Sequence, residues 1–175
     1  VLVQLSVVFV DIWEFTAISE NLSPTTLVER LNRFYRLTAQ TVFDLDGTLD
    51  KMVGDEVMAF FGAPFRHEEH AARAVRAALE IVSGAQEYAN GIDGFPVGAG
   101  VATGEVFMGN VGEGEVRDFT VIGDTVNTAA RLQSLASSGE ILITDETFRA
   151  TSALGSLEVR TLELKGKEAP VLAHV

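Results

Sequence analysis

The sequence predicts an α+β fold, with a ferredoxin-like βαββαβ core and further strands and helices appended. Short apolar runs and helical periodicities follow one another as strand, helices, hairpin, helix and strand, which is the order of that core. The 175 residues contain no cysteine, yet they are enough for one domain to bury a core without disulfides. We expect a single domain, residues 1–175. Because it begins at Val1 and enters a strand almost at once, we also expect it to be part of a longer protein with regulatory domains.

The elements of the first half are predicted from apolar spacing and from residues typical of helix ends and turns. Ser23 supplies an N-cap and Pro24 suits the first helical position, so a long amphipathic helix should start there. The elements expected before residue 62 are a strand ending on Asp11, a short helix at 13–22, a long helix from Pro24 to about Asp44, and a hairpin at 48–61 that turns at Gly54-Asp55.

The second half alternates strands and helices in the same way. After a breaker at 62–64, we expect a helix at 67–89, strands at 97–103 and 105–111 around Gly104, a mobile tip at 112–115, a strand at 119–122, a helix at 125–136, a strand at 141–143, a short helix from Asp145, and a terminal strand pair near 157–164 and 171–175. Helices should cover one face of the sheet, which leaves the other face for a ligand or a second copy.

Charge and composition exclude several classes of function. The formal net charge is -12, so nucleic acid and anionic membranes would be repelled over most of the surface. No apolar run reaches the length of a membrane span and no segment resembles a signal peptide. Without cysteine, thiolate metal sites and thiol redox chemistry are impossible. We expect a cytoplasmic domain that contacts neither nucleic acid nor membrane directly, although the full-length protein could be attached to a membrane.

Two acidic residues, Asp11 and Asp55, each follow an apolar strand-like run. If the first strand and the hairpin are neighbours, both carboxylates meet at the same side of the sheet. Converging carboxylates beside exposed backbone suit Mg²⁺, which takes oxygen ligands and completes its shell with water and phosphates. The alternative is two solvated turn residues, because Asp is common in turns.

A second pair, Asn127 and Arg131, is spaced four residues apart on a predicted helix, so both side chains project from one face. Arginine offers a fixed fork of donors for phosphate oxygens, and asparagine can bond a ribose. The alternative is an ordinary solvated surface pair.

Four ordered motifs closely resemble those of class III nucleotidyl cyclase catalytic domains. They are F-V-D-I-W-E-F-T, K-M-V-G-D-E-V-M-A-F-F-G, G-V-A-T-G-E-V-F-M-G-N-V-G and D-F-T-V-I-G-D-T-V-N-T-A-A-R-L, and the match extends to I-L-I-T and L-K-G-K. The resemblance covers nearly the whole chain, and all motifs occur in order at compatible spacing.

The resemblance implies conversion of ATP to 3′,5′-cyclic AMP and pyrophosphate by two Mg²⁺ ions, for which Mn²⁺ can substitute. Asp11 and Asp55 match the family's metal-binding aspartates, and the Ile12 carbonyl is a further expected ligand. One ion would acidify the ribose 3′-hydroxyl and the other would neutralise the triphosphate. Asn127 matches the residue that orients the ribose, and Arg131 the one that stabilises charge on the α-phosphate.

Lys51 and Thr120 match the positions that read the purine. Lysine can donate to adenine N1 and threonine can accept from the N6 amine, so the pair favours ATP, whereas guanylyl cyclases of the family usually carry glutamate at the lysine position. Threonine at this place resembles the class IIIb adenylyl cyclases, which are often stimulated by bicarbonate. Taken without the resemblance, Lys51 could be a solvated strand charge and Thr120 an ordinary strand residue.

The resemblance also implies residues that bind the phosphates. In the family, backbone amides near the residues matching Phe15 and Thr16 approach the β- and γ-phosphates, but Glu14 replaces a common glycine there. Its carboxylate either repels triphosphate or turns outward to solvent, as glutamate usually does. Lys165 and Lys167 lie in a segment whose lysine contacts the triphosphate in some relatives, and the sequence does not choose between them.

The two aspartates in the family serve one site while the other polar residues complete it across a dimer interface. This chain has both sets, so the resemblance implies a homodimer with two symmetric sites and an inactive monomer. The alternatives are a catalytically silent module that dimerises and senses nucleotide, and a guanylyl cyclase. His67, His70 and His174 form no credible metal motif.

Overall fold

The computed structural model describes residues 1–87, 93–151, 159–162 and 171–174. Its elements are β1 (Leu2–Ile12), α1 (Phe15–Glu20), α2 (Pro24–Asp44), β2 (Thr48–Val53), β3 (Glu56–Phe61), α3 (His70–Gln86), β4 (Val97–Glu113), β5 (Val116–Ile122), α4 (Asp124–Leu135), β6 (Ile141–Thr144), α5 (Asp145–Arg149), β7 (Val159–Leu162) and β8 (Val171–His174). The order of elements is the predicted one, except that the single strand β4 stands where two strands were expected.

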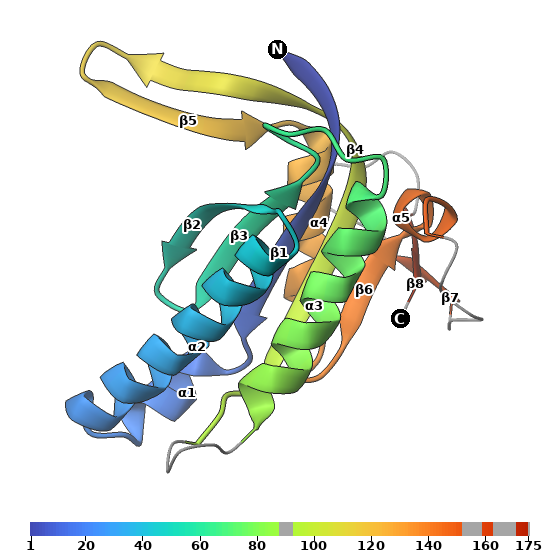
Figure 1. The fold of residues 1–175 in the computed structure, drawn as a ribbon. Coiled ribbons are helices and arrows are strands. Elements are labelled where there is room, and N and C mark those ends of the chain that lie inside the picture. The colour runs from blue at the N-terminus through green and yellow to red at the C-terminus, as the bar shows by residue number, and fades with distance from the viewer. Residues whose placement is uncertain (88–92, 152–158, 163–170, 175) are drawn as a thin grey trace.

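Within the described residues, eight strands form one sheet in the order β2-β3-β1-β4-β6-β8-β7, with β5 paired to the far half of β4 (Figure 1). Strand β3 lies between β1 and β2 and is antiparallel to both. With β4 antiparallel on the other side of β1, the first four strands have the arrangement of a ferredoxin-like core. The predicted fold class is therefore confirmed, and β5 to β8 are the appended strands.

The sheet is covered by helices on both faces, so the prediction of a single covered face is wrong. Strand β1 shows the alternation: Val8 and Val10 pack into the core beneath α2 and α3, while Val7 and Phe9 belong to a second core that includes Ala129 of α4. In Figure 1, α2 and α3 lie in front of the sheet and α4 lies behind it. Helix α4 follows the ferredoxin-like core in the sequence. It nevertheless packs on the sheet, because β1 and β4 have apolar residues on both faces and a helix must bury each face.

Strand β4 is one continuous element rather than two strands separated at Gly104. That glycine marks close packing instead of a break, since a Cβ there would lie 2.6 Å from the Thr125 hydroxyl oxygen at the start of α4. Gly100 has the same role further along, because its Cβ would lie 2.4 Å from the Ala129 carbonyl oxygen. The helix therefore lies directly on the backbone of β4.

Helix boundaries agree with the prediction to within a few residues. The Ser23 hydroxyl accepts a hydrogen bond from the Thr26 amide at 3.2 Å, which confirms the N-cap of α2. Helix α1 is shorter than expected, and α3 begins at His70 instead of residue 67. Helix α3 ends at Gln86, three residues before the predicted end at residue 89, because Glu87 has an extended conformation.

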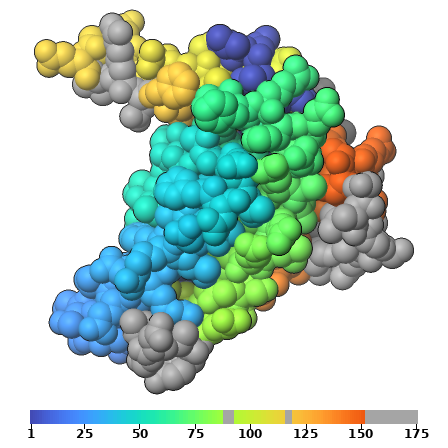
Figure 2. All heavy atoms as spheres, viewed as in Figure 1, coloured from blue at the N-terminus to red at the C-terminus, as the bar shows by residue number. Residues whose placement is uncertain are grey.

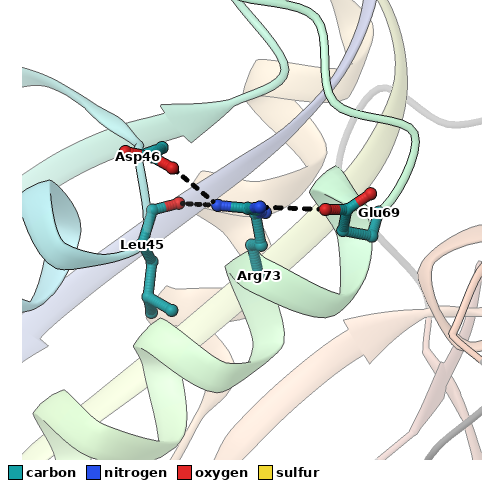
Figure 3. A network of polar contacts seen from close by, with 4 residues as sticks. All are labelled: Leu45, Asp46, Glu69 and Arg73. Atoms are coloured by element: carbon teal, nitrogen blue, oxygen red, sulfur yellow. Dashed lines mark hydrogen bonds and ion pairs between the residues drawn. The ribbon is translucent and has the colours of Figure 1, made fainter.

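Arg73 of α3 fastens the turn that follows α2 (Figure 3). Its guanidinium donates to the Leu45 carbonyl and to the Asp46 carboxylate, both at 3.0 Å, and to Glu69 at 2.9 Å. The bond to a backbone carbonyl holds the α2–β2 connection against α3. Figure 2 shows the result, with α2 and α3 packed side by side over this face.

The hairpin of β4 and β5 projects away from the rest of the molecule (Figures 1 and 2). Its apolar side chains Phe119 and Ile122 are 60% and 46% exposed. Phe107 and Val111 of β4 are exposed as well. A search of the described helices finds none with the length and apolar character needed to cross a membrane.

Candidate active site

Asp11 and Asp55 are brought together by the pairing of β1 with β3. Asp11 is the penultimate residue of β1, and Asp55 lies in the two-residue turn between β2 and β3, after Gly54 with its φ of 59°. The Ile12 amide donates to the Asp55 carbonyl at 3.1 Å. The predicted meeting of the two acids at the ends of neighbouring strands is therefore present in the structure.

The two carboxyl groups are electrostatically coupled. Burial raises the pKa of Asp11 to about 7, and a side-chain hydrogen bond with Asp55, the charge of Asp55 and the charge of Glu56 act in the same direction, opposed by a backbone hydrogen bond at Ile12. Glu56 is the cross-strand partner of Asp11. Three acidic groups at one place repel one another unless a proton or a cation lies between them.

Asp11 carries a specific indication of a cation. Its Oδ1 atom is buried and has no hydrogen-bond partner, which is costly for a carboxylate unless something positive coordinates it. Among the described residues, no group of three or more His, Cys, Asp or Glu side chains is arranged to hold a metal. The donor set is thus the Asp11 and Asp55 carboxylates with backbone oxygen nearby, and this oxygen-only set fits Mg²⁺ or Mn²⁺.

Tyr35 of α2 holds the turn that carries Asp55, a contact that the sequence did not reveal. Its hydroxyl donates to the Gly54 carbonyl. Burial, and then the charge of Asp55, raise the pKa of Tyr35. Because β2 lies at an edge of the sheet, this bond adds support from α2 to a turn that β1 contacts through the Ile12 amide and Asp11.

The segment after β1 leads directly into α1. Glu14 is the N-cap residue of α1 in the left-handed conformation, with φ 54° and ψ 39°, and it is exposed. The outward position is the one expected for a glutamate here. Phe15 packs edge-on against Phe95 with ring centroids 6.2 Å apart, while Thr16 is exposed at the start of the helix.

Lys51 and Thr120 lie on the wall of one cavity of about 370 Å³. The other residues lining it are Phe9, Val53, Glu56, Met58, Val121, Ile122 and Val126. Most of this wall is apolar, so the cavity suits a flat ring with a few polar edge atoms. The structure therefore brings the two predicted purine-reading residues together within one chain.

A β-bulge places a further polar group in contact with the wall of this cavity. The register of β2 against β3 shifts between Leu49 and Lys51, which leaves Asp50 as the extra residue. The Asp50 carboxylate accepts a hydrogen bond from the Thr120 hydroxyl at 2.8 Å. Sequence reasoning missed Asp50, although its place directly before Lys51 was the available signal.

Asn127 and Arg131 project from α4, on the sheet face that also carries Phe9 and Met58. Asn127 is exposed and Arg131 half-buried. Within the described part of the chain, neither side chain makes a hydrogen bond or an ion pair, and no salt bridge joins Arg131 to Asp11. Lys165 and Lys167 lie outside the described residues.

Comparison with known proteins identifies the family. The sequence model described as "Adenylate and Guanylate cyclase catalytic domain" matches residues 2–173.

The chain belongs to this cyclase family.

The cyclase domain is 39% identical over 138 residues to Adenylate cyclase 1 of Rhizobium meliloti (strain 1021), a match that covers 75% of this chain and 21% of that protein. Its structure resembles that of the adenylyl cyclase CyaB from P. aeruginosa, with a TM-score of 0.89, 31% identity, and coverage of 99% of this chain and 93% of the other. It also resembles the guanylyl cyclase Cya2, with a TM-score of 0.88, 30% identity, and coverage of 99% and 91%. The chain thus spans about a fifth of the length of that Rhizobium relative.

Proposed function

We propose that this cyclase domain is an adenylyl cyclase, which converts ATP to 3′,5′-cyclic AMP and pyrophosphate as a homodimer. The observation that carries the proposal is the apolar cavity with the Lys51 amine and the Thr120 hydroxyl on its wall. Adenine presents an acceptor at N1 and a donor at N6, which a lysine donor and a threonine acceptor match. Guanine presents a proton at N1 and an acceptor at O6, which the same two groups oppose. The pair also fits the class IIIb subgroup.

The carboxyl pair supplies the metal site in this proposal. Asp11, Asp55 and the Ile12 carbonyl would hold two Mg²⁺ or Mn²⁺ ions, and the buried, unpartnered Oδ1 of Asp11 supports their presence. When bound, such ions lower the pKa of the attacking hydroxyl and neutralise the phosphates. The chain itself positions the carboxylates, through Tyr35 and the Ile12 amide.

The remaining groups orient the substrate. Asn127 would hold the ribose, and Arg131 would stabilise the negative charge that develops on the α-phosphate. Backbone amides near Phe15 and Thr16, at the start of α1, would contact the β- and γ-phosphates.

Dimerisation is supported by polar side chains that have no partner in the described part of a single chain and by apolar side chains that are exposed there. Asn127 and Arg131 have no partner within the described residues, and the exposed apolar residues Phe119 and Ile122 extend along the projecting hairpin. Contiguous exposed apolar surface commonly marks a protein interface. A twofold dimer would join the aspartates of one copy to α4 of the other and so form two equal sites. Regulatory domains elsewhere in the full-length protein and a cytoplasmic location stay predictions.

The decisive experiment combines product analysis with complementation. Cyclic AMP and cyclic GMP are measured from ATP and GTP with Mg²⁺ or Mn²⁺ over a range of protein concentrations. We expect cyclic AMP to predominate, and specific activity to rise with concentration. Asp55→Asn and Arg131→Ala should each be inactive while remaining folded.

Mixing these two variants tests the shared site directly. In a mixed dimer, one site loses both residues and the other keeps both. Half of the dimers are mixed at equal concentrations, so activity should return to about a quarter of wild type. No recovery, with mixed dimers demonstrated, would contradict a site built from two chains.

A guanylyl cyclase is the second candidate, because the guanylyl cyclase Cya2 and the guanylate cyclase domain of RhGC from Catenaria anguillulae are both similar in structure. Predominant cyclic GMP would establish it. Nucleotide binding without either product would favour the silent sensing module. Stimulation by bicarbonate is tested in the same assay by adding the ion at fixed pH.

A further inference from the structure

The bulge in β2 places two successive residues on the same side of the sheet. Leu49 is paired with Ala59 and packs against the core beneath α2 and α3, whereas Lys51 is paired with Met58 and lines the cavity on the opposite face. In a regular strand, residues 49 and 51 would share a face. The extra residue at position 50 breaks that alternation, so Lys51 lines the cavity while the Asp50 carboxylate contacts Thr120 on its wall.

The hydrogen bond between Asp50 and Thr120 fixes the direction of the Thr120 hydroxyl. A threonine hydroxyl has one proton to donate and two lone pairs that can accept. Here the proton is directed to the Asp50 carboxylate at 2.8 Å, which accepts only. Thr120 is 6% exposed, so water cannot readily take over either role. The hydroxyl is left with lone pairs and no proton for a ligand.

We infer that Asp50 is a positioning residue for purine selection, which acts through Thr120. With its proton held by Asp50, Thr120 accepts the N6 amine of adenine and cannot donate to O6 of guanine. The negative charge of Asp50 has the same effect, because it attracts the amine hydrogens at N6 of adenine and repels the O6 oxygen of guanine. The inference rests on the proposed function insofar as the cavity must bind the base.

A purely structural role is the competing explanation, since the bond also joins the β2–β3 hairpin to β5. Such a role predicts lower stability and equal loss of binding for all nucleotides. A positioning role instead predicts a change in the ratio of the affinities for adenine and guanine nucleotides. This ratio of affinities does not depend on the amount of folded protein, so measuring it distinguishes a positioning role from a structural one.

The test measures binding of 3′-deoxy-ATP and 3′-deoxy-GTP with Mn²⁺, by competition against a fluorescent nucleotide. Neither analogue has the 3′-hydroxyl, so neither can cyclise and binding is separated from turnover. Asp50→Ala should lower the preference for the adenine analogue about tenfold, the equivalent of about 1.4 kcal/mol and of one net hydrogen bond. Part of the change should be tighter binding of the guanine analogue, because the freed hydroxyl can now donate to O6.

A double-mutant cycle shows whether the effect passes through Thr120. In a Thr120→Val background, Asp50→Ala should change the ratio by less than about twofold, since no hydroxyl remains to be oriented. Asp44→Ala, at the end of α2 on the other face of the sheet, is the charge-matched control and should leave the ratio unchanged. If Asp50→Ala fails to fold, Asp50→Asn replaces it. Its amide both donates and accepts, so the preference should fall part of the way.

The outcomes separate this inference from the proposed function. An unchanged ratio in both Asp50 variants, or an undiminished effect in the Thr120→Val background, overturns the inference and leaves the cyclase proposal intact. An adenine preference that depends on Asp50, in a protein that forms no cyclic product, supports the inference and refutes the proposed activity. A wild-type preference for the guanine analogue overturns both.

Discussion

Replacing Gly100 by alanine should displace α4 from the sheet. The new Cβ would lie 2.4 Å from the Ala129 carbonyl oxygen and 2.5 Å from the Gln133 nitrogen, where ordinary contact begins at 3.4 Å. Both neighbours are backbone atoms of α4, so no side chain can rotate away and the helix must retreat by about 1 Å. Overpacking of this kind costs typically 1–3 kcal/mol, and backbone neighbours place Gly100→Ala toward the upper end.

Two assays follow from that displacement. At about 2–4 °C per kcal/mol for a chain of this size, the melting temperature should fall by roughly 4–10 °C. Asn127 and Arg131 are residues of α4 and would be displaced with it. A misplacement of about 1 Å can lower a reaction rate about 100-fold. The ratio kcat/KM should therefore fall by one to two orders of magnitude, roughly, at a temperature where the variant is still folded.

Gly84→Ala in α3 is the matched control. Its Cβ would meet the Leu37 side chain at 3.0 Å, and that side chain can adjust. Alanine is favoured over glycine within a helix by about 1 kcal/mol, so the control should melt at or above the wild-type temperature. If Gly100→Ala melts within 1 °C or so of wild type and retains its kcat/KM, the argument that α4 lies directly on β4 is refuted.

Two further predictions concern Glu14 and His70. Glu14→Gly should leave the KM for MgATP nearly unchanged, because the carboxylate is exposed, and should raise the free energy of unfolding by about 1 kcal/mol by relieving the left-handed conformation; a several-fold lower KM would show instead that Glu14 opposes substrate. Burial, and then the charge of Arg66, lower the pKa of His70 below its ordinary value of 6.5, so the unfolded chain binds the proton more readily and stability falls as the pH drops through 6.5. His70→Gln should reduce the difference in melting temperature between pH 7.5 and 5.5, and an equal difference in both proteins would exclude His70 as a cause.

The core of the fold could be predicted because its signals are local. Ser23-Pro24 marks the start of α2, and Gly54-Asp55 marks the turn of the hairpin. The continuous apolar run in β1 indicates a strand buried on both faces, yet it does not indicate which helix covers each face. The position of α4 is set by long-range packing against Gly100 and so had no local signature.

The candidate site likewise contains residues that could be predicted from the sequence and residues that could not. Residues with a distinctive chemical type in a recognisable motif, such as Asp11, Asp55 and Lys51, could be named from sequence. Tyr35 and Asp50 could not, because each acts through one hydrogen bond to a residue distant in the chain. The sequence motif shows that Glu14 departs from a common glycine, but only the backbone angles explain why glycine is favoured there.

The bulge in β2 makes the proposed purine recognition depend on chain length as well as on residue type. Deleting one residue between Leu49 and Lys51 would restore a regular hairpin with every other pair intact. The residue lost would be Asp50, so the Thr120 hydroxyl would lose its acceptor, while Lys51 would keep its pairing with Met58 on the cavity side. By the inference above, a one-residue deletion at this point would alter base selection as a substitution at Thr120 would, although no residue that contacts the base had changed.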